Sequence, residues 1–140
     1  MEIKVANSQA EIIALILLRR DVFIFEQKVP LIEEFDEIDK TAIQLVVIDN
    51  QEVIATCRVI PTNNKYKIGR FAVKKAYRKQ KIGSKLLEFI EKMAKTNNID
   101  RLTLAAQITA IDFYQANGYK VYSDIFLDAG IEHLKMEKTI

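Results

Sequence analysis

Residues 71–87 read FAVKKAYRKQKIGSKLL, and this stretch is the most informative part of the chain. An apolar, strand-like segment from Phe71 to Val73 leads into a basic turn, which opens an amphipathic helix. From Lys65 to Leu87 the chain carries nine Lys or Arg residues and no acidic residue. Backbone N–H groups at a helix start, surrounded by cations, form a phosphate site because both favour negative charge. We therefore expect a phosphorylated ligand to bind at this turn.

Length and composition limit the class of protein. The chain has 140 residues, which predicts a single domain over residues 1–140. Its 49% apolar and 29% charged residues are typical of a soluble globular protein, and the net charge of +2 does not indicate a nucleic-acid partner. The first residues lack signal-peptide features and no apolar run is long enough for a membrane span, so we expect a cytoplasmic protein without a membrane partner.

The single cysteine, Cys57, precludes an internal disulfide bond. It lies in an apolar segment with no histidine nearby in the sequence, which predicts a buried, inert thiol rather than a nucleophile. No Cys or His spacing is typical of a metal site, so we expect no metal.

Hydrophobic periodicity and turn signals predict the element order β-α-β-β-β-α-β-α-β-β. The expected strands are residues 3–6, 42–48, 53–60, 66–73, 101–106, 119–122 and 133–137. The first expected helix starts at a capping box formed by Ser8 and Glu11 and ends at about Glu26. The second starts at Gly83 and ends at Asn97. The third starts at a second capping box, formed by Thr109 and Asp112, and ends at Gly118. Residues 29–40 are acidic and are expected to form a loop. This order favours an α/β (α+β) fold, a mixed sheet flanked by helices.

The basic turn differs from two well-known phosphate-binding motifs. It lacks the G-x-x-x-x-G-K-[ST] pattern of a P-loop, and no G-x-G-x-x-G is present for a Rossmann turn. The ligand must therefore be held by another type of strand–turn–helix unit.

The motifs of this chain resemble those of the GNAT superfamily of N-acetyltransferases. Arg78-x-x-Lys81-x-Gly83-Ser84 resembles the acetyl-CoA pyrophosphate motif, and Phe113-Tyr114-x-x-x-Gly118-Tyr119 resembles the next signature of the superfamily. Residues 20–30, 106–107 and 126–133 are similar to a small bacterial single-domain subgroup. The resemblance covers nearly the whole chain. It implies a GNAT-type mixed, mostly antiparallel sheet with helices on both faces, and direct acetyl transfer from acetyl-CoA, a co-substrate, to a primary amine of a small molecule or peptide.

Two positions depart from the family pattern. Lys81 stands where the motif usually has its first glycine, which lets the backbone approach the pyrophosphate. Gln44 stands where members of the subgroup often carry a histidine, so any role of that imidazole is absent here.

The resemblance also implies the residues that bind the donor. The backbone of residues 71–73 would hold the pantetheine arm, the basic turn would hold the phosphates, and Gln107 would bind a pantetheine amide unless it only caps the next helix. The cofactor-binding residues implied are Phe71, Ala72, Val73, Arg78, Lys79, Lys81, Ile82, Gly83, Ser84, Gln107 and Phe113.

Three residues are candidates for catalysis. Tyr114 falls where the general acid of the family protonates the departing thiolate; the alternative is that its ring only packs. Glu26 or a water relay is expected as the general base, because residues 26–39 hold six carboxylates. Such an acidic segment should favour cationic acceptors, unless it is only a solvated loop. His133, the only histidine, is either an acid or base near the acceptor or a structural residue.

Other functions are consistent with parts of the sequence. A CoA-binding regulator without catalysis would also carry the basic turn, and the departures at Lys81 and Gln44 favour it. A nucleic-acid-binding module would use the basic cluster of residues 65–85, whose aromatic residues could stack on bases. A faint similarity to acyl-homoserine-lactone synthases is opposed by the absence of tryptophan. We expect a monomer or a homodimer.

Overall fold

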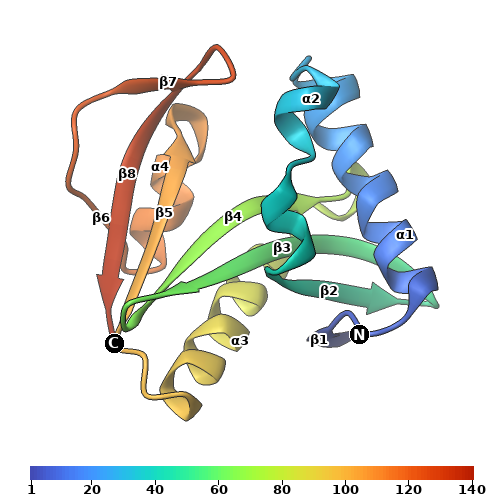
Figure 1. Cartoon of the computed structure of the whole chain (residues 1–140), viewed down its shortest axis with the longest axis horizontal. Coiled ribbons are helices and arrows are strands. Elements are labelled where there is room, and N and C mark those ends of the chain that lie inside the picture. The colour runs from blue at the N-terminus through green and yellow to red at the C-terminus, as the bar shows by residue number, and fades with distance from the viewer.

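The computed structural model describes residues 1–140 and contains one eight-stranded sheet. The strand order is β1-β2-β3-β4-β5-β8-β6, and β7 pairs with β8 outside this path (Figure 1). The strands are β1 (Glu2–Val5), β2 (Ile43–Asp49), β3 (Glu52–Thr62), β4 (Lys65–Val73), β5 (Arg101–Gln107), β6 (Lys120–Val121), β7 (Phe126–Asp128) and β8 (Ile131–Thr139). Only β4 and β5 pair in parallel. The expected α/β fold with a mostly antiparallel sheet is confirmed.

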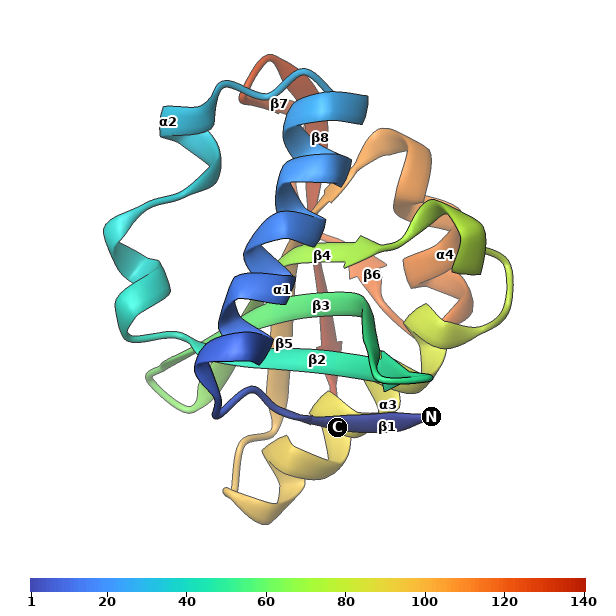
Figure 2. The same ribbon diagram turned by 90° about the vertical axis from the view of Figure 1, so that its right-hand side faces the viewer.

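Helices cover both faces of the sheet (Figures 1 and 2). The α-helices are α1 (Gln9–Arg19), α2 (Leu31–Glu34), α3 (Ile82–Thr96) and α4 (Ile111–Ala116). Short turns of other helix types are the π-helix η1 (Arg20–Glu26) and the 3₁₀ turns η2 (Glu37–Lys40), η3 (Lys75–Tyr77) and η4 (Ile108–Ala110). No helix is long and apolar enough to cross a membrane.

The first helix confirms the sequence prediction and adds a detail. The Ser8–Glu11 capping box is formed in both directions, and helical structure continues to Glu26. Its last part, η1, is wound as a π-helix, a feature that often marks functional sites in proteins.

Three expectations about local structure were wrong. Residues 29–40 are not a plain loop, because they contain α2 and η2, held by buried arginines. The second capping box is absent: Thr109 lies inside the turn η4, and α4 follows Ala110 without a side-chain cap. Strand β7 was not predicted, because three residues form a strand only through pairing with β8.

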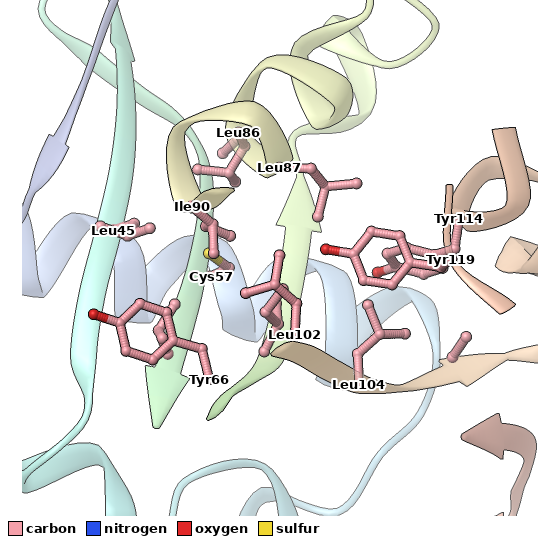
Figure 3. Packing of buried hydrophobic residues seen from close by; sticks show 14 of the residues in the cluster. Leu45, Cys57, Tyr66, Leu86, Leu87, Ile90, Leu102, Leu104, Tyr114 and Tyr119 are labelled. Atoms are coloured by element: carbon pink, nitrogen blue, oxygen red, sulfur yellow. The ribbon is translucent and has the colours of Figure 1, made fainter. Parts of the chain in front are cut away.

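The main core lies between the sheet and the helices α3 and α4. Leu86, Leu87 and Ile90 of α3 are each at most 1% exposed, and they pack against strand residues that include Cys57 and Leu102 (Figure 3). Burial raises the pKa of the Cys57 thiol, so the expectation of a buried thiol is confirmed and the neutral, unreactive form is favoured.

The other face of the sheet is held partly by ion pairs. Arg19 of α1 is 1% exposed; its Nε donates to Glu34 Oε1 at 2.8 Å and its Nη1 to Asp39 Oδ1 at 2.7 Å. Arg58 of β3 donates from Nη1 to Asp36 Oδ1 at 2.7 Å and to Asp39 Oδ1 at 2.9 Å. These bonds fix α2 and η2 against α1 and β3.

The carboxylates of this network respond differently to burial. Burial raises the pKa of Glu34 even beside Arg19. Burial would also raise the pKa of Asp39, but hydrogen bonds and charges from Arg19 and Arg58 outweigh it and hold that pKa below its usual value. The stabilisation from Asp39 is therefore present at neutral pH and is lost as the pH falls through its folded pKa.

Replacing Arg19 by Leu should lower the free energy of unfolding at pH 7 by about 3–5 kcal/mol, because Glu34 is left buried without its partner. The loss should shrink towards pH 4, where Glu34 can take up a proton in the variant. Urea unfolding at both pH values measures the difference. Arg20→Leu is the matched control, because Arg20 pairs with Asp21 at an exposed position; equal losses in both variants would contradict a buried network.

Candidate active site

The site is created where two neighbouring strands separate. The parallel ladder between β4 and β5 pairs residues 65–68 with residues 101–104 and ends there. Both strands continue, β4 to Val73 and β5 to Gln107, without pairing to each other. The final residues of β4 therefore present a backbone edge that no strand covers on the β5 side.

A bulge in β4 accompanies this separation. The register between β3 and β4 shifts between Thr56 and Arg58, and Arg70 opposite the shift has a φ of +51°. A bulge bends its strand and increases its twist, which turns the end of β4 away from β5. Phe71, the next residue, packs on the α4 face, with its ring centroid 6.0 Å from those of Phe113 and Tyr114.

The basic turn follows β4 and leads into α3, as predicted. Lys79 and Lys81 have φ values of +64° and +62°, and Lys81 directly precedes α3. Lysine therefore adopts the left-handed conformation that glycine accommodates without strain. Gly83 has a different role, because a Cβ atom there would lie 2.8 Å from Phe113 Cζ. Its missing side chain allows α3 and α4 to pack closely.

Arg78, a predicted phosphate ligand, is paired with Glu26, the predicted base. The guanidinium donates to both carboxylate oxygens, at 2.9 and 2.8 Å, and its Nε donates to the Val73 carbonyl at 2.9 Å. Hydrogen bonding to Arg78 holds the pKa of Glu26 below its usual value. The structure thus brings together two residues for which the sequence suggested separate roles.

Tyr114 is buried in a cluster of aromatic rings. Its ring centroid lies 5.0 Å from that of Phe113 and 5.8 Å from that of Tyr119, both in edge-on arrangements. Figure 3 shows Tyr114 and Tyr119 side by side, next to Leu87 and Leu104. Burial raises the pKa of Tyr114, so its phenol keeps its proton at neutral pH. The hydroxyl of Tyr119 is buried and has no hydrogen-bond partner.

His133 and Gln107 occupy opposite positions on neighbouring strands, and both face the side of α1. The ladder pairs Gln107 with His133, and directly opposed residues of antiparallel strands place their side chains on one face. His133 Nδ1 lies 2.7 Å from the Ile131 carbonyl. Because a carbonyl only accepts, Nδ1 is the donor of this bond, and in the neutral imidazole Nε2 is then the nitrogen that accepts.

Gln107 does not cap a helix. Its Nε2 donates to Gln27 Oε1 at 2.7 Å, which joins the end of β5 to the residue after η1. Sequence reasoning missed Gln27, although it lies next to Glu26 in a segment whose resemblance to a family was noted. The residue type gave no further signal, because glutamine is common on surfaces.

The acidic segment is largely neutralised. Of its six carboxylates, Glu34, Asp36 and Asp39 bind Arg19, Arg58 or Arg70, and Glu26 binds Arg78. This pairing leaves less negative charge to attract a cationic acceptor than the sequence suggested. No group of three or more His, Cys, Asp or Glu side chains is arranged to hold a metal ion.

Comparisons with known proteins agree with this geometry. Residues 21–140 match the model of the acetyltransferase (GNAT) domain family. The chain is 33% identical over 139 residues to the "Uncharacterized N-acetyltransferase YjcF" of Bacillus subtilis, with 99% of each chain covered.

Solved structures are similar over almost the whole chain. A putative N-acetyltransferase from Lactobacillus plantarum has a TM-score of 0.91 and 28% identity, covering 99% of this chain and 97% of the other. An acyl-CoA N-acyltransferase from Pseudomonas aeruginosa has a TM-score of 0.87 and 26% identity, with the same coverage of 99% and 97%. The chain therefore belongs to the GNAT acetyltransferase family, as an N-acetyltransferase that takes its acyl group from an acyl-CoA.

Proposed function

We propose that the protein moves an acetyl group from acetyl-CoA directly to a primary amine of a small molecule or a peptide. The open edge of β4 beside the basic turn carries this proposal, because both lie on one continuous piece of chain. An extended pantetheine arm can bond to an open strand edge as an added strand does. A diphosphate needs several converging N–H donors and a cation.

The proposed donor contacts begin on β4 and end on α3. The backbone of Phe71, Ala72 and Val73 binds the pantetheine arm. The N–H groups proposed for the diphosphate belong to Lys79, Lys81, Ile82, Gly83 and Ser84, and Arg78 supplies a positive charge. Phe113, which packs against Gly83, supports the helix start from the side of α4.

The transfer requires two proton movements. The amine nitrogen attacks the thioester carbonyl carbon, an amide C–N bond forms, and the C–S bond breaks. The nitrogen loses one proton, and the sulfur leaves as a thiolate that gains one. We assign the second proton to Tyr114, a phenol that carries its proton at neutral pH and whose ring centroid lies 6.0 Å from that of Phe71 at the open edge of β4, with solvent restoring the proton afterwards.

We assign the first proton to His133 Nε2, directly or through a water molecule. The bond from Nδ1 to Ile131 leaves Nε2 able to accept, and the side chain faces α1, across the sheet from Tyr114. The opening between β4 and β5 lets groups on the two faces reach one thioester. Glu26 is a weaker candidate, because its ion pair with Arg78 lowers its pKa and hence its basicity.

Titration calorimetry with acetyl-CoA, and with dephospho-CoA and ATP as comparators, tests the donor. An assay of thiol release with a panel of amines then tests the transfer. Because the acidic segment is neutralised, we expect acceptors with one amino group to perform at least as well as spermidine. Saturable donor binding without turnover would favour a CoA-binding regulator, whereas an equal response to any polyanion would favour the nucleic-acid alternative.

Tyr114→Phe should lower kcat by about 10²-fold or more while the affinity for acetyl-CoA stays nearly the same, because only the proton donor is removed. Steady-state kinetics and calorimetry measure the two quantities. Tyr119→Phe is the matched control: its hydroxyl has no partner, so its loss should not reduce the rate. An unchanged kcat for the Tyr114 variant would remove it from the mechanism.

His133→Gln should also lower kcat by about 10²-fold, since the proton acceptor is lost. Glu26→Gln should instead keep kcat and strengthen acetyl-CoA binding, because Arg78 no longer has a carboxylate that competes with the diphosphate. The pair of variants assigns the base: a large loss of kcat in Glu26→Gln with none in His133→Gln would reverse the assignment.

Lys81→Gly should bind acetyl-CoA at least as tightly as the natural protein, because glycine adopts a φ of +62° without strain. Gly83→Ala should weaken binding and lower the free energy of unfolding by about 1–3 kcal/mol, since the added Cβ overlaps Phe113. Calorimetry and urea unfolding compare them. Weaker binding by Lys81→Gly would show instead that the lysine charge contributes.

A further inference from the structure

Two consecutive residues at the end of η1 are linked to the two separated strands, Glu26 to β4 through Arg78 and Gln27 to β5 directly. Glu26 binds Arg78, which in turn donates to the carbonyl of Val73, the last residue of β4. Gln27 accepts a hydrogen bond from Gln107, the last residue of β5. The end of this helix therefore spans the opening between β4 and β5.

The backbone around these residues is wound tightly and well supported. The Gln27 N–H donates to the Val22 carbonyl at 3.1 Å, the Val29 N–H donates to the Phe23 carbonyl at 2.8 Å, and Lys28 has a φ of +62°. These backbone hydrogen bonds hold the side chains of residues 26 and 27 at a defined place on the helix end.

This helix end is also packed against the sheet and the last hairpin. Val22, Phe23 and Val29 form a buried cluster with Leu18 and with Ala72 of β4. Ala129 of the β7–β8 turn and Ile131, the first residue of β8, pack against this cluster. Figures 1 and 2 show the upper end of α1 and strand β7 at the same end of the molecule. The residues that link the two strands therefore follow a helix that is packed firmly against the sheet.

The two bonds differ in what donor binding does to them. A diphosphate at the basic turn competes for Arg78, so the link to β4 depends on the donor. The Gln27–Gln107 bond joins two neutral amides, so it offers no charge for which a diphosphate would compete, and it is the one side-chain hydrogen bond between β5 and the residue that follows η1. We therefore expect this link to remain when the donor binds.

We propose that Gln27 is a positioning residue: by holding Gln107, it sets the separation of the ends of β4 and β5 and thereby places the thioester against the acceptor amine. This inference rests on the proposed function. His133 lies directly across the ladder from Gln107, so a shift of Gln107 also moves the proposed base. A misplacement of about 1 Å can cost about 10²-fold in rate, far more than the bond contributes to folding.

The test compares Gln27→Ala with Gln27→Glu. Alanine removes the oxygen that accepts from Gln107, whereas glutamate keeps an oxygen at the same distance along the side chain. We expect kcat to fall by about 10-fold or more in Gln27→Ala, with a much smaller change in KM for acetyl-CoA, and to recover in large part in Gln27→Glu. The double variant Gln27→Glu with Gln107→Glu places two carboxylates together, and its kcat should be as low as that of Gln27→Ala.

A second readout needs no turnover. In ¹⁵N NMR spectra, the side-chain NH₂ of Gln107 should show a hydrogen-bonded, dispersed shift in the natural protein and in Gln27→Glu, and should lose it in Gln27→Ala. Backbone shifts of residues 71–73 and 105–107 should move in the same variant. Retained spectra and kcat in Gln27→Ala, or equal damage by both substitutions, would overturn the proposal.

The two readouts separate this inference from the function on which it rests. If the natural protein acetylates no amine, the proposed function fails. The NMR comparison then still decides whether Gln27 sets the strand separation.

Discussion

The parallel ladder between β4 and β5 ends at Ile68 and Leu104, and the rest of the active site depends on that break. Backbone N–H and C=O groups in a sheet need partners, so strands that separate in the middle of a sheet leave groups that a ligand can satisfy. The bulge at Arg70 turns β4 away, and the chain then continues directly into the basic turn and α3. One irregularity thus leaves a strand edge open just before a basic helix start, and the proposed donor site rests on these two features.

The two faces of the sheet are stabilised by different forces, and the proposed acid and base lie on different faces. The α3–α4 face is an apolar core that includes Tyr114, the proposed proton donor. The α1–α2 face is held by arginine–carboxylate pairs, which cancel most of the charge of an otherwise acidic segment. The α1–α2 face, on which we propose that the acceptor binds, is therefore held together by ion pairs and carries little net negative charge.

The Arg78–Glu26 pair joins the proposed phosphate site to the end of η1. A guanidinium that is neutralised by a carboxylate attracts a diphosphate less strongly than a free one, so we expect Glu26 to lower the affinity for the donor. The same helix end carries Gln27, which reaches the other strand. The contact with the proposed phosphate ligand and the contact with β5 therefore both lie at the end of one short π-helical segment.

The amino-acid sequence by itself determined the order of the main elements, the large helices and the basic turn, but not the short elements α2 and β7. Apolar periodicity and capping residues are local signals: Ser8 and Glu11 start α1, and Leu and Ile residues at helical spacing define one buried face of α3. The motifs around Arg78 and Tyr114 were sufficient to suggest the family, because they are also local. The prediction of a second capping box was wrong because it, too, used only a local pattern: a preceding 3₁₀ turn places Thr109 outside the cap position.

Only the tertiary structure decided which side chains meet. Glu26 and Arg78, Gln27 and Gln107, and Arg19 and Glu34 are joined across 52, 80 and 15 positions of the chain, and no local pattern specifies such pairs. These contacts depend on where the strands separate and on how the π-helix ends. Residues 29–40 carried acidic residues that suggested a solvated loop, and burial against arginines from α1, β3 and β4 made them structured and nearly neutral. Charge is visible in a sequence, but its neutralisation requires partners that only folding brings within reach.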